Sequence, residues 1–187
     1  TKEQGRDGIR RILSLKKNLY GYSLDENAEK IVGIINNFHF WESYIVESPT
    51  IEQIKQEIDK KNPIILPTHG RYLYNPHFLS GGPDYHTVVI SGYDDERQVF
   101  ITQEPGTRHG LDFEYKYDTL MNAMHNFLPV KNTRNGRKIA IFTRKNAESE
   151  LELDGDRDGL TKAEELKNGT ILWLKDSDGD GYTDGEE

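Results

Sequence analysis

Apolar side chains recur every three to four residues in three stretches near the N-terminus, a spacing typical of helices that bury one face. The second stretch opens with Ser23 and Glu26, and the third opens with Thr50 and Gln53. Each pair has the spacing of a capping box, in which the two side chains satisfy backbone N–H groups at the helix start. The pattern therefore predicts helices over residues 1–18, 23–35 and 50–61.

Short runs of β-branched and aromatic residues, bounded by turn-forming residues, predict strands between and after these helices. Asp118 is placed to cap one more short helix, over residues 119–126. Because most of the strands follow the helices with short connections, the pattern predicts an α+β body with an antiparallel sheet. The predicted strands cover residues 38–46, 64–67, 87–90, 99–102, 113–117 and 138–144.

Two of these strands form a predicted β-hairpin with its turn centred on Asp95. In that register His86 lies directly opposite Glu104, and opposed side chains in an antiparallel pair are about 5 Å apart. The hairpin would therefore hold an imidazole beside a carboxylate, which is how a general base is oriented in a nucleophilic triad. Spacing alone favours the plainer alternative, an ion pair beside a turn, because such neighbours are common.

The connection Thr68–Pro83 is long for a segment without regular structure. It is rich in aromatic, histidine and glycine residues, and loops of this kind often carry binding functions. We interpret it as a candidate substrate-binding loop that acts through His69, Arg71, Tyr72 and His77.

Charge is divided unevenly along the 187 residues. Residues 151–187 hold twelve acidic and four basic side chains, which accounts for the whole net charge of −8. Residues 1–150 are balanced and lack the basic surface that phosphate binding requires, so nucleic acid is not an expected partner. No apolar run has the length of a membrane span, and the absence of cysteine excludes disulfides within this sequence.

The acidic tail contains the calcium-loop pattern D-x-D-x-D-G-x5-E twice. Alternating aspartates supply oxygen ligands, the glycine allows a sharp turn, and the closing glutamate can bind through both oxygens. The pattern predicts a calcium-binding domain over residues 148–187, and the alternative is a disordered acidic tail. The predicted ligands are Asp154, Asp156, Asp158, the Leu160 carbonyl and Glu165, then Asp176, Asp178, Asp180, the Tyr182 carbonyl and Glu187.

Three segments of the body together resemble a known family. They are Pro63–Gly70, the pair Tyr85 and His86 with the strand that follows, and Glu104–Gly110. They are similar to cysteine peptidases related to the bacteriocin-processing, double-glycine leader peptidases, which have a papain-like fold, and the likeness spans about Gly21–Phe127. The tail resembles the calcium repeats of thrombospondin type-three and dockerin-like modules of bacterial secreted proteins.

The first resemblance implies that His86 is the general base and that Glu104, where the family usually has aspartate, orients it. The family's nucleophilic cysteine lies on an N-terminal helix, which would precede Thr1. We therefore expect residues 1–147 to be the larger part of a secreted or cell-surface thiol peptidase that acts on peptides or proteins. The sequence as given should be inactive without that cysteine. The alternative is a non-catalytic module of the same fold that binds a peptide or a cell-wall ligand.

Overall fold

The computed structural model describes residues 2–21, 25–37, 41–128, 136–145, 154–171 and 174–187, with only the backbone for residues 2–5 and 7. The chain divides into two compact units. The larger comprises Ser23–Gly33 and Ser43–Arg144, and the smaller comprises Thr1–Tyr22, Ile34–Glu42 and Lys145–Glu187. The domain boundary expected near residue 147 remains a prediction. No described helix combines the length and apolarity needed to cross a membrane.

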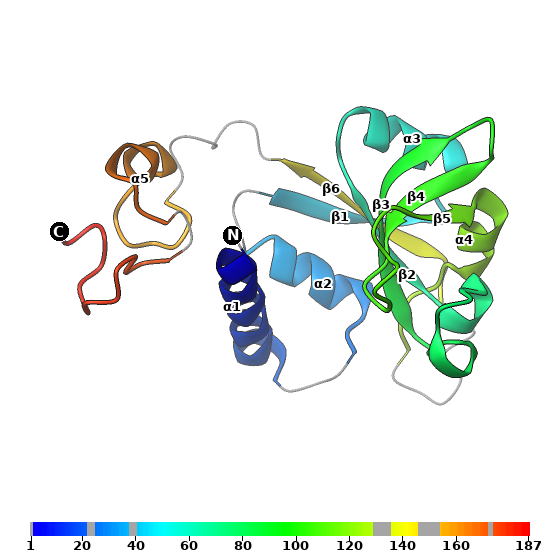
Figure 1. The fold of residues 1–187 in the computed structure, drawn as a ribbon, viewed down its shortest axis with the longest axis horizontal. Helices are drawn as coiled ribbons and strands as arrows, with labels where there is room; N and C mark the ends of the chain where they lie inside the picture. The colour runs from blue at the N-terminus through cyan, green and yellow to red at the C-terminus, as the bar shows by residue number, and fades with distance from the viewer. Residues whose placement is uncertain (1, 22–24, 38–40, 129–135, 146–153, 172–173) are drawn as a thin grey trace. The chain divides into compact units, whose positions relative to one another are not determined.

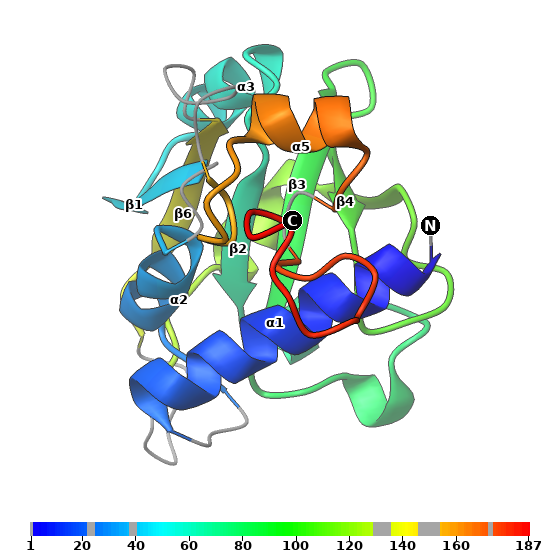
Figure 2. The same ribbon diagram turned by 90° about the vertical axis from the view of Figure 1, so that its left-hand side faces the viewer.

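One sheet of six strands forms the centre of the larger unit. Its strands are β1 (Trp41–Glu47), β2 (Ile64–Thr68), β3 (His86–Asp94), β4 (Val99–Gln103), β5 (Phe113–Lys116) and β6 (Ile139–Lys145). They lie in the order β1-β6-β2-β3-β4-β5, and Figure 2 shows most of them side by side. Strand β2 pairs with β3 and with β6, β3 pairs with β4, and β4 pairs with β5, and all four pairs are antiparallel, which confirms the predicted α+β class.

The helices are α1 (Lys2–Tyr20), α2 (Ala28–Ile35), α3 (Ile51–Asp59), α4 (Tyr117–Ala123) and α5 (Lys162–Asn168) (Figure 1). The capping box that was predicted for α3 is confirmed. The Gln53 N–H donates to Thr50 Oγ1 at 3.1 Å, and the Thr50 N–H donates to Gln53 Oε1 at 2.8 Å. Helix α3 therefore begins directly after Thr50, as the capping box predicts.

Helices α2 and α4 begin at other residues than predicted. Helix α2 begins at Ala28, after Asn27, whose side chain accepts the N–H of Lys30 at 3.1 Å, and Ser23 lies outside the described residues. Helix α4 begins at Tyr117, so this residue is not part of a strand and Asp118 is not the cap. The tyrosine ring is buried against Phe100, which indicates that packing and not capping sets this boundary.

The core of the larger unit lies where α3 and α4 pack on the sheet. Its fully buried side chains include Ile54, Leu66, Ile90, Phe100 and Leu120. Burying one such side chain contributes about 1.5–3 kcal/mol, so these residues fix β2, β3 and β4 firmly against the helices. The ends of β3 and β4, where the candidate site lies, are therefore held by a rigid framework.

The predicted register of the central hairpin was wrong. Asp94 pairs with Val99 across a turn of residues 95–98, and a bulge between Ile90 and Gly92 then shifts the pairing by one residue. Beyond the bulge Val89 pairs with Gln103. A turn centred one to two residues further along the chain than expected, and an unpaired residue in β3, cannot be read from strand propensity alone.

Candidate active site and candidate calcium loops

His86 and Glu104 lie together at one end of the sheet, where His86 opens β3 and Glu104 follows β4. His86 Nε2 is 2.6 Å from Glu104 Oε1. The contact is confirmed although the register was not, because the observed pairing makes the two residues diagonal neighbours, and a long side chain spans that separation. The Glu104 side chain is fully buried, and that of His86 is 12% exposed.

Three donors hold the Glu104 carboxylate. His86 and the Gly106 N–H, at 2.7 Å, share Oε1, while the Tyr115 hydroxyl donates to Oε2 at 2.9 Å. Burial by itself would raise the pKa of Glu104, but these hydrogen bonds outweigh it and keep the pKa below its ordinary value of 4.5. Glu104 is therefore an ionised acceptor at neutral pH.

The ionised carboxylate determines the tautomer of a neutral His86 ring. Because Glu104 Oε1 can only accept, Nε2 must carry the proton, and the lone pair of the neutral imidazole lies on Nδ1. Among the described residues no hydrogen bond reaches Nδ1, and the ring is braced by the edge of Phe78, with ring centroids 5.2 Å apart. Nδ1 is thus the nitrogen placed to accept a proton from a nucleophile.

Gly106 packs closely beside this pair, where a side chain would have little room. A Cβ there would lie 3.0 Å from Glu104 Oε1, 3.0 Å from Phe78 Cε1 and 3.1 Å from His86 Cε1. Any larger residue would push the imidazole, the carboxylate or the bracing ring. The absent side chain therefore lets the diagonal His86–Glu104 contact close.

The four residues predicted to bind substrate do not gather into one cluster. His69 is 1% exposed and its ring stacks on Tyr72, with centroids 4.3 Å apart. Arg71 is exposed and its Nε donates to Asp84 at 2.9 Å, while His77 is exposed and stacks on His109 at 4.4 Å. Their role in substrate binding remains a prediction, and the structure does not present the His69 ring at the surface.

Two residues beside His86 and Glu104 were not predicted from the sequence. Tyr115 was predicted only as a strand residue, and Asn75 was not singled out within its loop. Both are buried, at 3% and 4% exposure: Asn75 donates to the Tyr115 hydroxyl, and Tyr115 donates to Glu104. The alternation of aromatic residues in β5 was a signal that Tyr115 faces the core, but only the fold shows that it reaches Glu104.

Comparison with known proteins adds to this geometry. Residues 13–133 match the Peptidase C39-like family. The chain belongs to this family. A solved structure described as a C39-like peptidase from Bacillus anthracis shares 14% identity and a TM-score of 0.47, over 67% of this chain and 62% of that one. The chain thus covers less than two thirds of that protein. No curated protein matches the sequence. This match confirms that the body is related to cysteine peptidases of this family, as the sequence predicted. The matched residues end before the acidic tail.

The two acidic loops in the smaller unit have the same backbone conformation. In each loop the first aspartate accepts N–H bonds from the fourth and sixth residues, at 2.5 and 3.0 Å in the first loop and at 2.6 and 2.9 Å in the second. These positions also share positive φ angles, with Arg157 at 64°, Gly159 at 107°, Gly179 at 80° and Gly181 at 105°. The sequence repeat is therefore a structural repeat.

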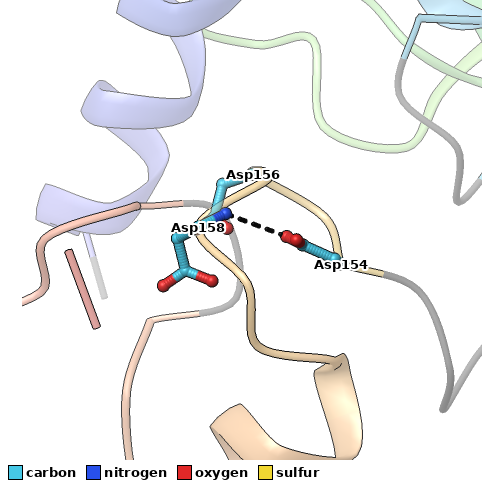
Figure 3. Close-up of side chains that lie close together, drawn as sticks. All are labelled: Asp154, Asp156 and Asp158. Atoms are coloured by element: carbon cyan, nitrogen blue, oxygen red, sulfur yellow. Dashed lines mark hydrogen bonds between the residues drawn. The ribbon is translucent and has the colours of Figure 1, made fainter. Parts of the chain in front are cut away.

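The first loop brings three aspartates together, and two of its buried carboxylates, those of Asp156 and Glu165, have no described hydrogen-bond donor. Oxygens of Asp154, Asp156 and Asp158 lie within 4.8 Å of one another, and Figure 3 shows the Asp158 N–H donating to Asp154 at 3.2 Å. Asp156 and Glu165 are 3% and 0% exposed, yet no described donor reaches any of their four carboxylate oxygens. Buried charges of this kind are costly unless they are paired or coordinate a metal ion.

The two buried carboxylates of the first loop have raised pKa values, as expected for charges without donors. Burial and the nearby Asp158 raise the pKa of Asp156 to about 6, against the opposing charge of Arg11. Burial and the charges of Asp156 and Asp158 raise the pKa of Glu165 to about 7. The residues present therefore fit a cation, which would replace the missing donors with metal–oxygen bonds.

The second loop is more open. Oxygens of Asp176, Asp178 and Asp180 also lie within 4.8 Å of one another, but these residues are less buried and Glu187 is exposed. Described hydrogen bonds join the loops: Lys175 Nζ donates to the Arg157 carbonyl at 2.8 Å, and the Gly185 N–H donates to Asp158 Oδ2 at 3.1 Å. In both loops the three predicted aspartate ligands therefore lie together, and those of the first loop are the more buried.

Proposed function

We propose that this chain supplies the general base and the orienting acid of a papain-like thiol peptidase, whose nucleophilic cysteine lies outside these 187 residues. The observation that carries the proposal is the contact of 2.6 Å between His86 Nε2 and the buried, ionised carboxylate of Glu104. Membership in the Peptidase C39-like family supports the same class of reaction and a peptide or protein as substrate.

In the proposed reaction His86 and Glu104 each have a defined role. A cysteine thiol gives its proton to His86 Nδ1 and attacks the carbonyl carbon of a peptide bond. Glu104 stabilises the resulting imidazolium through Nε2–H and keeps the ring in one orientation. His86 then returns the proton to the leaving amine, which leaves a thioester. Water, deprotonated by His86, hydrolyses the thioester and releases the carboxylate product and the free thiol.

The test is peptide cleavage by the chain extended with its natural upstream sequence. We expect the extended protein to cleave unstructured peptides, and His86→Ala and Glu104→Gln to lower kcat by about a hundred-fold or more. His109→Ala is the control, because this histidine is exposed, its ring stacks on His77, and its described hydrogen bond, from the backbone N–H, is to Thr107 and not to Glu104. Cleavage by the 187-residue chain alone would show that the nucleophile is wrongly assigned. An extended protein that binds peptides without cleaving them would establish the alternative, a binding module.

A second proposal concerns the smaller unit, whose acidic loops we infer to bind calcium. The observation that favours it is the pair of buried carboxylates, Asp156 and Glu165, whose oxygens meet no described donor. Alternating aspartates, two loop carbonyls and a closing glutamate form the oxygen-rich set that calcium requires. Loops on so small a core should bind in the range of extracellular modules, about 0.1–1 mM, which supports a location outside the cell or at its surface.

Calorimetric titration tests the calcium proposal. We expect two binding events or one coupled pair, and Glu165→Gln should remove the event of the first loop. Glu164→Gln is the matched control, because Glu164 is exposed and bonds to Thr161 in the capping box of α5, a role that glutamine also fills. No heat at millimolar calcium would end the proposal, and so would equal binding by both variants.

A further inference from the structure

A buried chain of hydrogen bonds runs from Glu104 into the loop between β2 and β3. The Tyr115 hydroxyl donates to Glu104 Oε2 at 2.9 Å, and Asn75 Nδ2 donates to the Tyr115 oxygen at 2.7 Å. All three residues are at most 4% exposed. Water therefore cannot readily replace either hydrogen bond, and the geometry of each link depends on the next.

The donor and the acceptor of each hydrogen bond in this series can be assigned. The His77 N–H, which can only donate, lies 2.9 Å from Asn75 Oδ1, so the amide of Asn75 must present its NH2 group to Tyr115. Because the Tyr115 oxygen accepts from Asn75, its single proton is available for Glu104. Burial and the charge of Glu104 raise the pKa of Tyr115, so the hydroxyl remains a donor.

We infer that Tyr115 and Asn75 are positioning residues for the catalytic base. They hold Glu104 Oε2, while the Gly106 N–H and His86 share Oε1, so the carboxylate is fixed at both ends. A glutamate side chain has one more rotatable bond than aspartate, and this second anchor removes the added freedom. The catalytic meaning of the inference rests on the proposed peptidase function, whereas the anchoring itself does not.

The anchoring can be measured in the chain without any activity. In Tyr115→Phe the carboxylate loses one donor, so the pKa of Glu104, followed by the carbon-13 shift of its carboxyl group, should rise. Asn75→Ala should raise it less, because Tyr115 keeps its own bond to Glu104. Tyr117→Phe is the matched control, since Tyr117 is a buried tyrosine that donates instead to Asp95 at 2.9 Å. An unchanged Glu104 pKa in Tyr115→Phe, or an equal rise in Tyr117→Phe, overturns the inference.

In the extended, cleaving protein the same variants separate positioning from folding. We expect Tyr115→Phe to lower kcat about ten-fold with little change in KM, and Tyr117→Phe to leave both unchanged. An unaltered kcat in Tyr115→Phe would remove its role in catalysis. If the pKa of Glu104 responds as expected but no peptide is cleaved by the extended protein, the peptidase proposal fails and the anchoring stands. The two failures are therefore distinguishable.

Discussion

Replacing Glu104 by glutamine probes the dyad closely, because it keeps the shape of the side chain and removes the charge. The carboxylate accepts bonds from His86, Gly106 and Tyr115 in a fully buried position. An amide has a single oxygen, so its NH2 group must face at least one of these donors. A buried donor left without a partner costs about 1–3 kcal/mol. We therefore expect Glu104→Gln to lower the free energy of unfolding by about 2 kcal/mol at neutral pH.

The stabilisation contributed by Glu104 depends on pH. Burial would raise the pKa of Glu104, but the hydrogen bonds to its carboxylate prevail and hold the pKa below 4.5. A carboxyl group with a depressed pKa stabilises the fold above its unfolded-state pKa, and this contribution is lost as the pH falls through the folded-state pKa. The difference in stability between the original chain and Glu104→Gln should thus be full at about pH 7 and shrink below about pH 4.5.

Urea unfolding followed by circular dichroism, at fixed calcium and at two pH values, measures that difference. Glu114→Gln is a suitable control, because Glu114 is exposed and pairs with Arg97 at the surface, where a salt bridge contributes about 0–1 kcal/mol. A Glu104→Gln effect of the same size at both pH values would refute the reasoning. An effect no larger than that of Glu114→Gln would refute it as well.

Three further changes have clear expected outcomes. Gly110→Ala should prevent normal folding or destabilise by about 3 kcal/mol in thermal unfolding, because its Cβ would lie 1.8 Å from the Glu104 carbonyl oxygen; a stability equal to that of the original chain would contradict the placement of this loop. Thr50→Ala should cost about 1 kcal/mol in the same assay through loss of the bond to the Gln53 N–H, and no cost would mean that the cap is not formed. Calcium should protect the backbone amides of residues 154–165 from hydrogen exchange, and Glu165→Gln should abolish that protection; protection without calcium would contradict the proposal.

Local signals in the sequence located several features well. The capping box at Thr50 and Gln53 fixed the start of α3, because both partners lie within one helical turn. The repeated aspartates of the tail likewise predict the shared backbone of the two loops, since each loop is closed by bonds within itself. Both features depend on residues that are close in sequence, which is why they can be predicted without the fold.

Features that depend on the fold were less accessible. The bulge at Ile90 and Gly92 changed the register of the hairpin, and no propensity marks it. The contact between His86 and Glu104 was nevertheless anticipated, because the family resemblance pointed to it independently of the register. The anchoring of Glu104 by Tyr115 joins β4 to β5, and the burial of Glu165 depends on how α5 packs. Such contacts need the three-dimensional arrangement.

The central claim is that His86 activates a cysteine supplied by sequence outside this chain. The most direct measurement is the pH dependence of the rate at which iodoacetamide alkylates that cysteine in the extended protein. An imidazole that takes the thiol proton lowers the pKa of the thiol, so rapid alkylation should persist well below pH 7 and should be lost in His86→Ala. A rate that follows an ordinary thiol pKa of about 8.5 and is unchanged in His86→Ala would contradict the account.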